Sequence, residues 1–245
     1  MKYLAAVIVM LVFSSSIAIA NGLVDSDWDG VPDLDEENIY FTDADNPDTD
    51  GDGYSDWLEL NTGYSPHNPK AVRLEDNDYD KDGLSDKDEL RFHTSLINKD
   101  TDGDGFSDYE EIKAGYDPLN KDKVLLSKRI EINIAKQELS FFLGGVLMGV
   151  FPVSSGLNNS TPRKHYKVAS KSPKAWSPYG LWMPYWLGLD SGRIGIHELP
   201  IWPNGYREGE DHLGKPASHG CVRLGEDSAE LIYNWTPIGT GVFIY

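Results

Sequence analysis

Ser218-His219-Gly220-Cys221-Val222-Arg223 is the stretch that decides how the C-terminal half of this 245-residue chain folds and works. It holds the only cysteine, so the chain forms no internal disulfide. A single thiol in an exported protein is either used or buried. A second candidate, His197, ends the upstream segment Arg193-Ile194-Gly195-Ile196-His197. Since a thiol needs a basic partner to react at neutral pH, this histidine makes Cys221 a candidate nucleophile, with a buried inert thiol as the alternative.

The residues around this stretch have the periodicity of β-strands. Apolar and polar residues alternate over 130–134, as in a half-buried strand. Segments 139–143 and 146–153 flank Gly144-Gly145 and predict a hairpin. We expect one main helix over 226–235 and a closing strand over 241–245. The sequence therefore predicts a mostly-β domain with a single long helix.

Several short motifs of this half carry a family resemblance. In chain order they are Gln137-Glu138-Leu139, Phe151-Pro152-Val153-Ser154-Ser155-Gly156, Thr161-Pro162, Met183-Pro184-Tyr185-Trp186, Gly195-Ile196-His197 and Ser218-His219-Gly220-Cys221-Val222-Arg223-Leu224. Together they resemble the L,D-transpeptidase (YkuD-type) catalytic domain over about half of the chain. The resemblance implies a β-sandwich-like fold and peptidoglycan stem peptides as substrates.

The resemblance also implies roles for the site residues. Cys221 becomes the nucleophile and His197 the proton donor and acceptor, because the family places that histidine at a strand end facing the cysteine. His219 would assist, although on spacing alone it is the more obvious base. Gly220 permits a tight turn whose backbone N–H groups can face a developing oxyanion, and Ser218 completes the loop.

Three further side chains are expected to bind substrate. Arg223 offers a planar fork for a carboxylate, but a salt bridge to Glu226 or Asp227 is an equal alternative. Tyr185 and Trp186 come with the family motif.

The chain departs from the family pattern between the catalytic histidine and the cysteine loop. Twenty residues separate His197 from Ser218, a few more than is usual, and Glu198 stands where a small residue is common. We expect the insertion, roughly 202–211, to form a surface loop that affects acceptor choice. His212, just beyond it, is a third candidate for the base.

The N-terminal half has a different chemistry. Residues 21–120 hold 29 acidic and 7 basic side chains, whereas residues 121–245 hold 11 acidic and 14 basic ones. This asymmetry predicts a domain boundary near Asn120, and it argues against a nucleic-acid partner. We divide the chain into a signal peptide (1–20), a repeat region (21–122) and a catalytic domain (123–245).

Four loops in the repeat region share one template. Each has carboxylates at positions 1, 3, 5, 9 and 12 and a glycine at position 6, which is the spacing of a calcium loop. The predicted ligands are Asp25, Asp27, Asp29, Asp33 and Glu36; Asp48, Asp50, Asp52, Asp56 and Glu59; Asp78, Asp80, Asp82, Asp86 and Glu89; and Asp100, Asp102, Asp104, Asp108 and Glu111. The predicted role of Ca²⁺ is structural, and no cofactor is expected for catalysis.

The loops come as two pairs. They begin at residues 25, 48, 78 and 100, and the second pair repeats the first with a shift of 52 or 53 residues. A short helix is expected after each loop and none before it, so these are not paired EF-hands. They resemble thrombospondin type 3 repeats. The alternative, an acidic disordered spacer, would have no need of the aromatic residues that the array contains.

The first twenty residues predict a secretory signal peptide. Lys2 precedes an apolar run over 4–13, and Ala18-Ile19-Ala20 provides a cleavage site before Asn21. The run is short for a membrane span, with an uncleaved anchor as the alternative. We expect export to the periplasm, the cell wall or the medium, with no membrane span in the mature chain.

The sequence thus predicts an exported, cysteine-dependent L,D-transpeptidase that serves cell wall biogenesis and cell shape. Its partners would be peptidoglycan stem peptides and, as acceptor, a stem amine or a protein lysine. With water as acceptor the same site would be an L,D-carboxypeptidase. A non-catalytic, calcium-dependent wall-binding module is the alternative from another class.

Overall fold

A computed structural model describes residues 24–190 and 193–245, which form two compact units. The first contains the described residues up to Lys81, with Ser85–Leu90 and Ser95–Asn98. The second contains Asp82–Leu84, Arg91–Thr94 and Lys99–Tyr245. The predicted signal peptide lies outside the described residues. Among those described, no helix has both the length and the apolar character that a bilayer crossing requires.

The N-terminal half is a series of loops that each lead into a short helix, as predicted. The first loop leads into α1 (Asp33–Asp35) and a π-helical turn (Glu36–Tyr40). The others lead into α2 (Asp56–Thr62), α3 (Asp86–Phe92) and α4 (Asp108–Ala114). Ser55 and Ser107 accept hydrogen bonds at the first turns of α2 and α4, which satisfies backbone N–H groups at the helix starts.

The C-terminal half is mostly β-structure with one main helix, which confirms the predicted fold class. The strands are β1 (Lys128–Asn133), β2 (Glu138–Leu143), β3 (Val146–Ser154), β4 (His165–Trp176), β5 (Trp182–Leu189), β6 (Ile194–Glu198), β7 (Val222–Leu224) and β8 (Gly241–Ile244). Two 3-10 turns, Leu157–Asn159 and Glu210–His212, lie between strands. The helix is α5 (Glu226–Trp235), with the bounds expected from the sequence.

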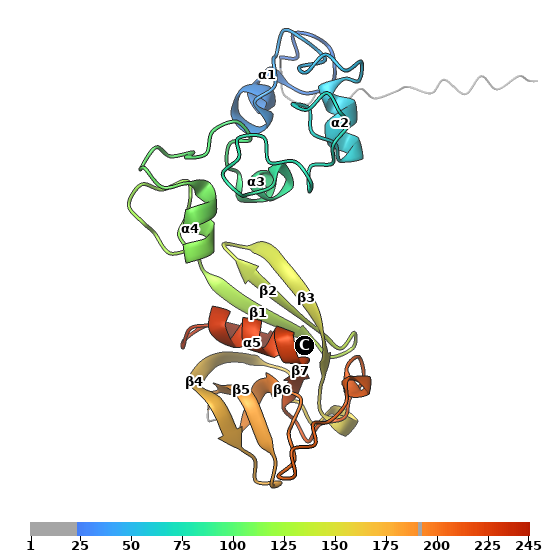
Figure 1. The fold of residues 1–245 in the computed structure, drawn as a ribbon, viewed down its shortest axis with the longest axis vertical. Helices are drawn as coiled ribbons and strands as arrows, with labels where there is room; N and C mark the ends of the chain where they lie inside the picture. Colours follow the sequence, from blue (N-terminus) through green and yellow to red (C-terminus); the bar gives the residue numbers. More distant parts are fainter. Residues whose placement is uncertain (1–23, 191–192) are drawn as a thin grey trace, which may run out of the picture. The chain divides into compact units, whose positions relative to one another are not determined.

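The eight strands close into a barrel in the order β1-β2-β3-β7-β6-β5-β4-β8. Strand β3 pairs with β2 on one side and β7 on the other, and β4 likewise joins β8 to β5. These two strands therefore connect two halves of a sandwich-like arrangement. Figure 1 shows α5 between the β1–β3 half and the β4–β6 half, and its Ala229 and Ile232 are buried in the main core.

The fourth loop belongs to the same compact unit as the barrel. Ile112 of α4 is buried in one apolar cluster with Leu84, Phe92 and Leu143 of β2. Tyr109, Leu126, Val146 and Trp235 of α5 pack against this cluster. The last repeat is thus built onto the β-domain through apolar contacts.

Candidate functional site

Cys221 lies at the end of a tight loop that leads into β7. Gly220, the residue before it, has φ of 142°, a backbone conformation that a side chain would strain. A Cβ at Gly220 would also lie 3.2 Å from the carbonyl oxygen of Ser160. The Thr161 hydroxyl accepts from the Gly156 N–H at 2.7 Å and donates to the Gly220 carbonyl at 2.9 Å. The loop is therefore fixed against the turn that follows β3.

Ser218 shapes the loop from within. Its hydroxyl donates to the carbonyl of Cys221 at 2.5 Å and accepts from the N–H of Gly220 at 3.0 Å. Its own N–H donates to the carbonyl of Ser155 at 3.0 Å. The Gly220 N–H is consequently engaged inside the loop, and it does not face the cavity as a free oxyanion donor.

His197 comes from β6, which runs parallel to β7 and pairs residue for residue with it. The imidazole is 2% exposed, and its Nδ1 lies 2.5 Å from the carbonyl oxygen of Glu198. A carbonyl only accepts, so Nδ1 carries the hydrogen and Nε2 is left as the basic nitrogen. Burial and, to a smaller extent, the charge of Arg223 lower the pKa of His197 from 6.5 to about 4, although the hydrogen bond to Glu198 acts in the opposite direction.

The thiol of Cys221 has the opposite shift. Burial raises the pKa of this thiol. A hydrogen bond from the Gly195 N–H and the charge of Arg223 lower it by less, so the net shift is upward. Burial is the largest cause for both Cys221 and His197, and it disfavours the charged form of each. At neutral pH the site therefore holds a neutral thiol and a neutral imidazole.

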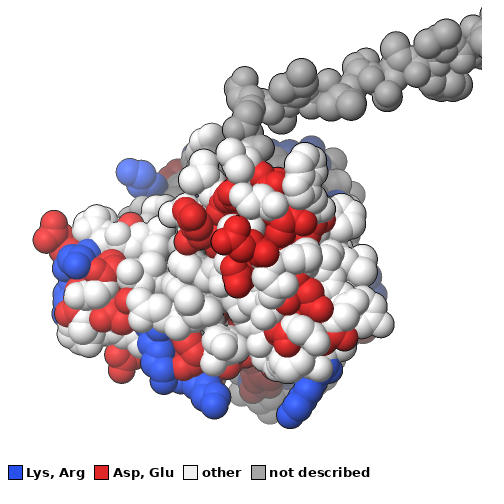
Figure 2. All heavy atoms as spheres, turned by 90° about the horizontal axis from the view of Figure 1, so that it is seen from above, with Lys and Arg blue, Asp and Glu red and all other residues white. Residues whose placement is uncertain are grey.

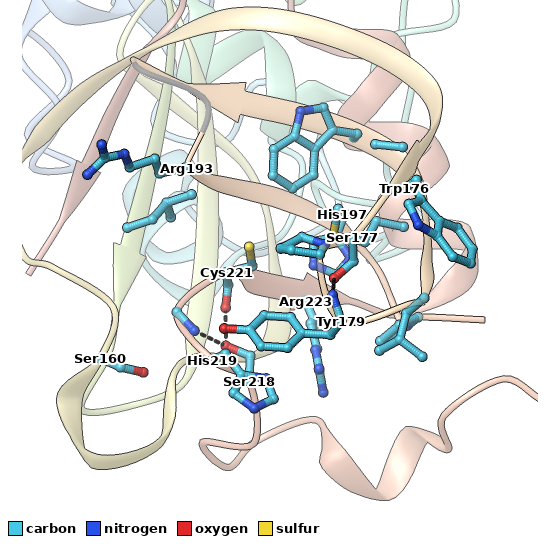
Figure 3. Close-up of a pocket in the computed structure, with 18 residues that line it drawn as sticks. Ser160, Trp176, Ser177, Tyr179, Arg193, His197, Ser218, His219, Cys221 and Arg223 are labelled. Atoms are coloured by element: carbon cyan, nitrogen blue, oxygen red, sulfur yellow. Dashed lines mark hydrogen bonds between the residues drawn. The ribbon is translucent and has the colours of Figure 1, made fainter. Parts of the chain in front are cut away.

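Both side chains line a cavity of about 520 Å³ (Figure 3). Its wall is formed by the cysteine loop, the end of β6 and the β4–β5 hairpin. Trp186 lines it too, with its ring centroid 5.8 Å from that of His197. A Cβ on Gly195 would meet the Trp186 ring at 2.5 Å, so glycine lets this indole lie across β6.

The competing histidines occupy other places. His219 lines the cavity, but its ring is exposed and stacks on Tyr179 with centroids 4.2 Å apart. His212 pairs with Glu208 at 3.2 Å and is absent from the cavity wall. Among these residues, His197 combines burial beside the cysteine with a free basic nitrogen.

Arg223 is engaged in a buried ion pair. Its Nη1 donates to the carboxylate of Glu208 at 2.6 Å, and both side chains are largely buried. Glu208 belongs to the predicted insertion at roughly 202–211. Arg207 beside it pairs with Glu198 and with Glu226. The insertion thus neutralises Arg223, whose expected salt-bridge partners were Glu226 and Asp227.

The cavity wall lacks one side chain predicted to bind substrate and includes three charged or aromatic ones that were not predicted. Tyr185 is absent from the cavity wall and packs against Tyr233 of α5. Arg193, which the sequence did not single out, is exposed and lines the cavity. It forms no salt bridge with any described residue, which makes it the open cation at this site. Trp176 and Tyr179 were also missed, because an aromatic residue in a hairpin turn has no distinctive spacing.

The acidic loops bring together the carboxylates at positions 1, 3 and 5. In each loop, oxygens of these three residues lie within 4.8 Å of one another, and acidic side chains gather on the face shown in Figure 2. The four groups are Asp25, Asp27 and Asp29; Asp48, Asp50 and Asp52; Asp78, Asp80 and Asp82; and Asp100, Asp102 and Asp104.

The glutamates at position 12 have the environment expected of cation ligands. Glu36, Glu59 and Glu111 are at most 4% exposed, and each has a buried carboxylate oxygen that accepts no hydrogen bond. Burial, reinforced by the neighbouring aspartates, raises the pKa of Glu59 to about 8 and those of Glu36 and Glu111 to about 7. Buried, unpaired carboxylates facing other carboxylates fit a hard divalent cation such as Ca²⁺.

The position-9 aspartates are used differently. Both oxygens of Asp56 accept hydrogen bonds from Thr49, at 3.0 and 2.7 Å, and Asp33 makes the same two bonds with Ser26. Asp108 repeats the arrangement with Thr101. Asp86 accepts from Ser65, Asn77 and Tyr79. These carboxylates hold the loop in shape, as Asp48 and Asp100 at position 1 also do by accepting backbone N–H bonds. The carboxylates at positions 1, 3 and 5 in addition lie close to one another.

The loops are joined in pairs, as the spacing predicts. Asp29 of the first loop accepts a hydrogen bond from the N–H of Trp57 in α2, at 2.8 Å, and the indole packs on Gly30. Asp82 accepts in the same way from Tyr109 in α4, whose ring packs on the glycine of the third loop.

Comparison with known proteins agrees with both halves. Residues 127–244 match the family model of the L,D-transpeptidase catalytic domain (YkuD), and residues 48–63 and 100–121 match the bacterial TSP3 repeat. The YkuD protein of Bacillus licheniformis is 26% identical over 117 residues, which are 47% of this chain and 64% of that protein. The YqjB protein of Bacillus subtilis is 28% identical over 128 residues, which are 46% of this chain and 68% of that protein. Both bear the name of an L,D-transpeptidase.

Solved structures give matches of similar extent. An L,D-transpeptidase from Mycobacterium tuberculosis is 25% identical, with 50% of this chain and 59% of that chain covered and a TM-score of 0.43. One from Mycobacterium smegmatis is 19% identical, with 49% and 59% covered and a TM-score of 0.42. The chain thus spans less than two thirds of the length of the first relative, at 64%, and of the first structure, at 59%.

Proposed function

Because residues 127–244 belong to the YkuD family of L,D-transpeptidase catalytic domains and follow bacterial TSP3 repeats, we propose that this protein is an exported cysteine transpeptidase acting on peptidoglycan stem peptides. The observation that carries the proposal is the pair of Cys221 and His197 on one cavity, with the imidazole tautomer fixed by Glu198. A nucleophile, a base and a group that orients the base are the parts that acyl transfer requires.

The first half of the reaction forms an acyl-enzyme. The sulfur of Cys221 attacks the carbonyl of the third stem residue while Nε2 of His197 takes the thiol proton. Proton transfer accompanies attack because the resting pair is neutral. With the Gly220 N–H engaged by Ser218, the N–H of Cys221 is the donor that we assign to the oxyanion. The imidazolium then protonates the departing D-alanine amine, which leaves a thioester.

The second half transfers the acyl group to an acceptor. An amine attacks the thioester carbonyl, His197 takes the proton of that amine, and the thiol of Cys221 is released with its proton restored. A stem amine as acceptor gives a cross-link, and a protein lysine attaches a protein to the wall. Water as acceptor gives the tripeptide, the product of an L,D-carboxypeptidase.

We assign binding of the stem peptide to Arg193 and Trp186. Arg193 is a cation at the cavity without a carboxylate partner among the described residues, so it is the group to bind a substrate carboxylate. Arg223 is held by Glu208, and its charge acts on the pKa of Cys221 and His197 from within the protein.

The repeat region (21–122) is proposed to bind structural Ca²⁺ and to space or dock the catalytic domain (123–245). Positions 1, 3, 5 and 12 of each loop would supply the oxygens, and the ion would remove the repulsion among them. L,D-transpeptidases are cell-wall enzymes, which implies export. The predicted signal peptide and a periplasmic or wall location complete the proposal.

The decisive experiment uses disaccharide-tetrapeptide muropeptides with and without an acceptor amine. Cross-linked dimers support the transpeptidase, and tripeptide alone supports the carboxypeptidase. Intact substrate with the wild-type protein contradicts both and favours a binding module. Cys221→Ala should abolish either product, whereas dimers formed by that variant would exclude the thiol mechanism.

A further inference from the structure

The tip of the β4–β5 hairpin, residues 176–182, carries exposed aromatic rings at the mouth of the Cys221 cavity. Trp176 is 52% exposed and Tyr179 is 60% exposed, and both line the cavity (Figure 3). Large aromatic rings left in water beside a cavity indicate a surface built for contact, because their burial is worth more than that of other side chains.

Backbone hydrogen bonds keep this tip in one conformation. The Ser177 N–H donates to the carbonyl of Leu181 at 2.8 Å, and the Gly180 N–H donates to the carbonyl of Ser177 at 3.0 Å. The hydroxyl of Ser177 accepts from the Tyr179 N–H at 3.0 Å, and Ser177 itself is buried. The backbone that carries the rings is thus ordered before any ligand binds, which reduces the entropy lost on binding.

Trp176 packs against a second tryptophan and is still 52% exposed. Trp182 lies directly opposite it in the strand register, and the two rings meet edge to face with centroids 4.6 Å apart. The ammonium of Lys174 lies 4.4 Å from the Trp182 centroid and so covers that second ring. Tyr179 differs, because it already stacks on His219.

The rim continues past the two tryptophans. Ile201 pairs with Trp182 through two backbone hydrogen bonds of 2.8 and 2.9 Å, and Arg207 pairs with Ile201. Trp176, Trp182, Ile201 and Arg207 therefore form one cross-strand row, of which Trp176 lines the cavity. This row is continuous with the site proposed for the stem peptide.

We propose that the hairpin tip docks the glycan chain that carries the stem peptide, with the face of Trp176 against one pyranose ring. The inference rests on the proposed function. A stem whose scissile carbonyl lies at Cys221 is covalently attached to sugar, so the sugar must leave the cavity across its rim. The C–H face of a pyranose is apolar and slightly positive, which suits the negative face of an indole. Its hydroxyl groups stay in water.

Calorimetry on the full chain with Cys221→Ala tests this without turnover. The ligands are disaccharide-tetrapeptide, the free tetrapeptide and the disaccharide alone. We expect the disaccharide-tetrapeptide to bind about tenfold tighter than the free tetrapeptide, a typical gain for one stacked ring. Adding Trp176→Ala should remove this difference and leave free tetrapeptide affinity unchanged. Trp176→Phe should retain most of it, and Tyr245→Ala, which removes an exposed aromatic ring at the chain end, should retain all of it.

Two results would overturn the proposal: equal affinity for both tetrapeptide ligands in the parent, or equal weakening of both by Trp176→Ala. Failure of the proposed function has a separate signature. In that case the wild-type protein converts neither tetrapeptide ligand, although the binding preference for the sugar-bearing ligand persists in calorimetry.

Discussion

The Nδ1–H of His197 donates to the backbone carbonyl of Glu198, the next residue in β6, at 2.5 Å. A backbone acceptor cannot move away or take the proton, so the imidazole is held in one tautomer with Nε2 basic. Many catalytic histidines are oriented by a carboxylate instead, which also favours the imidazolium. The arrangement seen in this chain orients the ring and leaves it easily deprotonated.

Because His197 is buried, we expect the enzyme to stay active to a lower pH than an exposed histidine would allow. The pKa of His197 is lowered to about 4 and that of Cys221 is raised, so the reactive protonation states persist over a wide pH range. As the pH falls through the pKa of His197, the imidazole becomes protonated and can no longer accept the thiol proton. We expect the acid limb of kcat/KM near pH 4, and His197→Gln should lower kcat by roughly 10²–10⁴. A limb near pH 6.5, the ordinary value for an exposed histidine, would contradict the buried assignment.

Removing Glu208 should destabilise the catalytic half. Glu208→Gln leaves the guanidinium of Arg223 buried without its counter-charge, and loss of one partner of a buried pair costs about 3 kcal/mol. Chemical denaturation measures this as a lower midpoint. Asp211→Ala is the control, because the Asp211–Lys215 pair is exposed and its loss should cost less than about 0.5 kcal/mol. Equal effects of the two variants would count against a buried pair.

Arg193→Ala should affect substrate binding more than the chemical step. The side chain lines the cavity and is exposed, so its removal leaves no buried charge. We expect KM to rise about tenfold with kcat within about twofold, as for loss of uniform binding. Steady-state kinetics with tetrapeptide substrates provides both parameters. A large fall in kcat with unchanged KM would instead assign Arg193 to the transition state.

Positions 9 and 12 of the second acidic loop should respond differently to mutation. Glu59 has a buried oxygen without a partner, so Glu59→Gln should weaken binding of one Ca²⁺ by at least about tenfold. Asp56 is satisfied by Thr49, so Asp56→Asn should change the affinity by no more than about threefold. Calcium titration calorimetry on the full chain distinguishes them, and the opposite ranking would make Asp56 the direct ligand.

Calcium in the fourth loop should stabilise the catalytic half. Glu111 is followed by Ile112, which is buried in one cluster with Leu143 of β2. We expect Ca²⁺ to slow amide hydrogen exchange in β2, as measured by mass spectrometry. Ile112→Ala should cost about 2–4 kcal/mol and reduce this effect of calcium. Ile238→Ala, at a position 65% exposed, should leave the calcium effect intact. If the rate of amide hydrogen exchange in β2 of the wild-type chain is the same with and without calcium, the cluster does not couple calcium binding to the stability of the β-domain.

Local patterns in the sequence predicted those elements whose structure depends on residues close to one another in the chain. The hairpin around Gly144-Gly145 and the helix Glu226–Trp235 form as predicted, because turn chemistry and apolar periodicity act within a few residues. The loop spacing likewise predicts which carboxylates converge at positions 1, 3 and 5. The pairing of the loops follows from their duplicated spacing.

Contacts between residues far apart in the sequence could not be predicted from local patterns. The partner of Arg223 is Glu208, which lies in an irregular segment and carries no periodic signal. Tyr185 sits in a recognisable motif, yet its direction depends on a backbone φ of 51° that packs it against α5. The change of charge near Asn120 marks the end of the calcium loops. It carries no information on packing, and Ile112, before that point, shares a cluster with β2.

The joined loops also restrict how this region can change in length. Each pair is closed by a backbone hydrogen bond and by an aromatic ring of the second helix on a glycine of the first loop. A loop gained or lost singly would leave a ring or a glycine without its counterpart, so we expect the number of loops to change in steps of two. The residues that close the second pair lie in the same compact unit as the barrel, whereas those of the first pair do not. Loss of a loop from the second pair would therefore remove contacts inside the unit that contains the barrel, whereas loss of a loop from the first pair would leave those contacts in place.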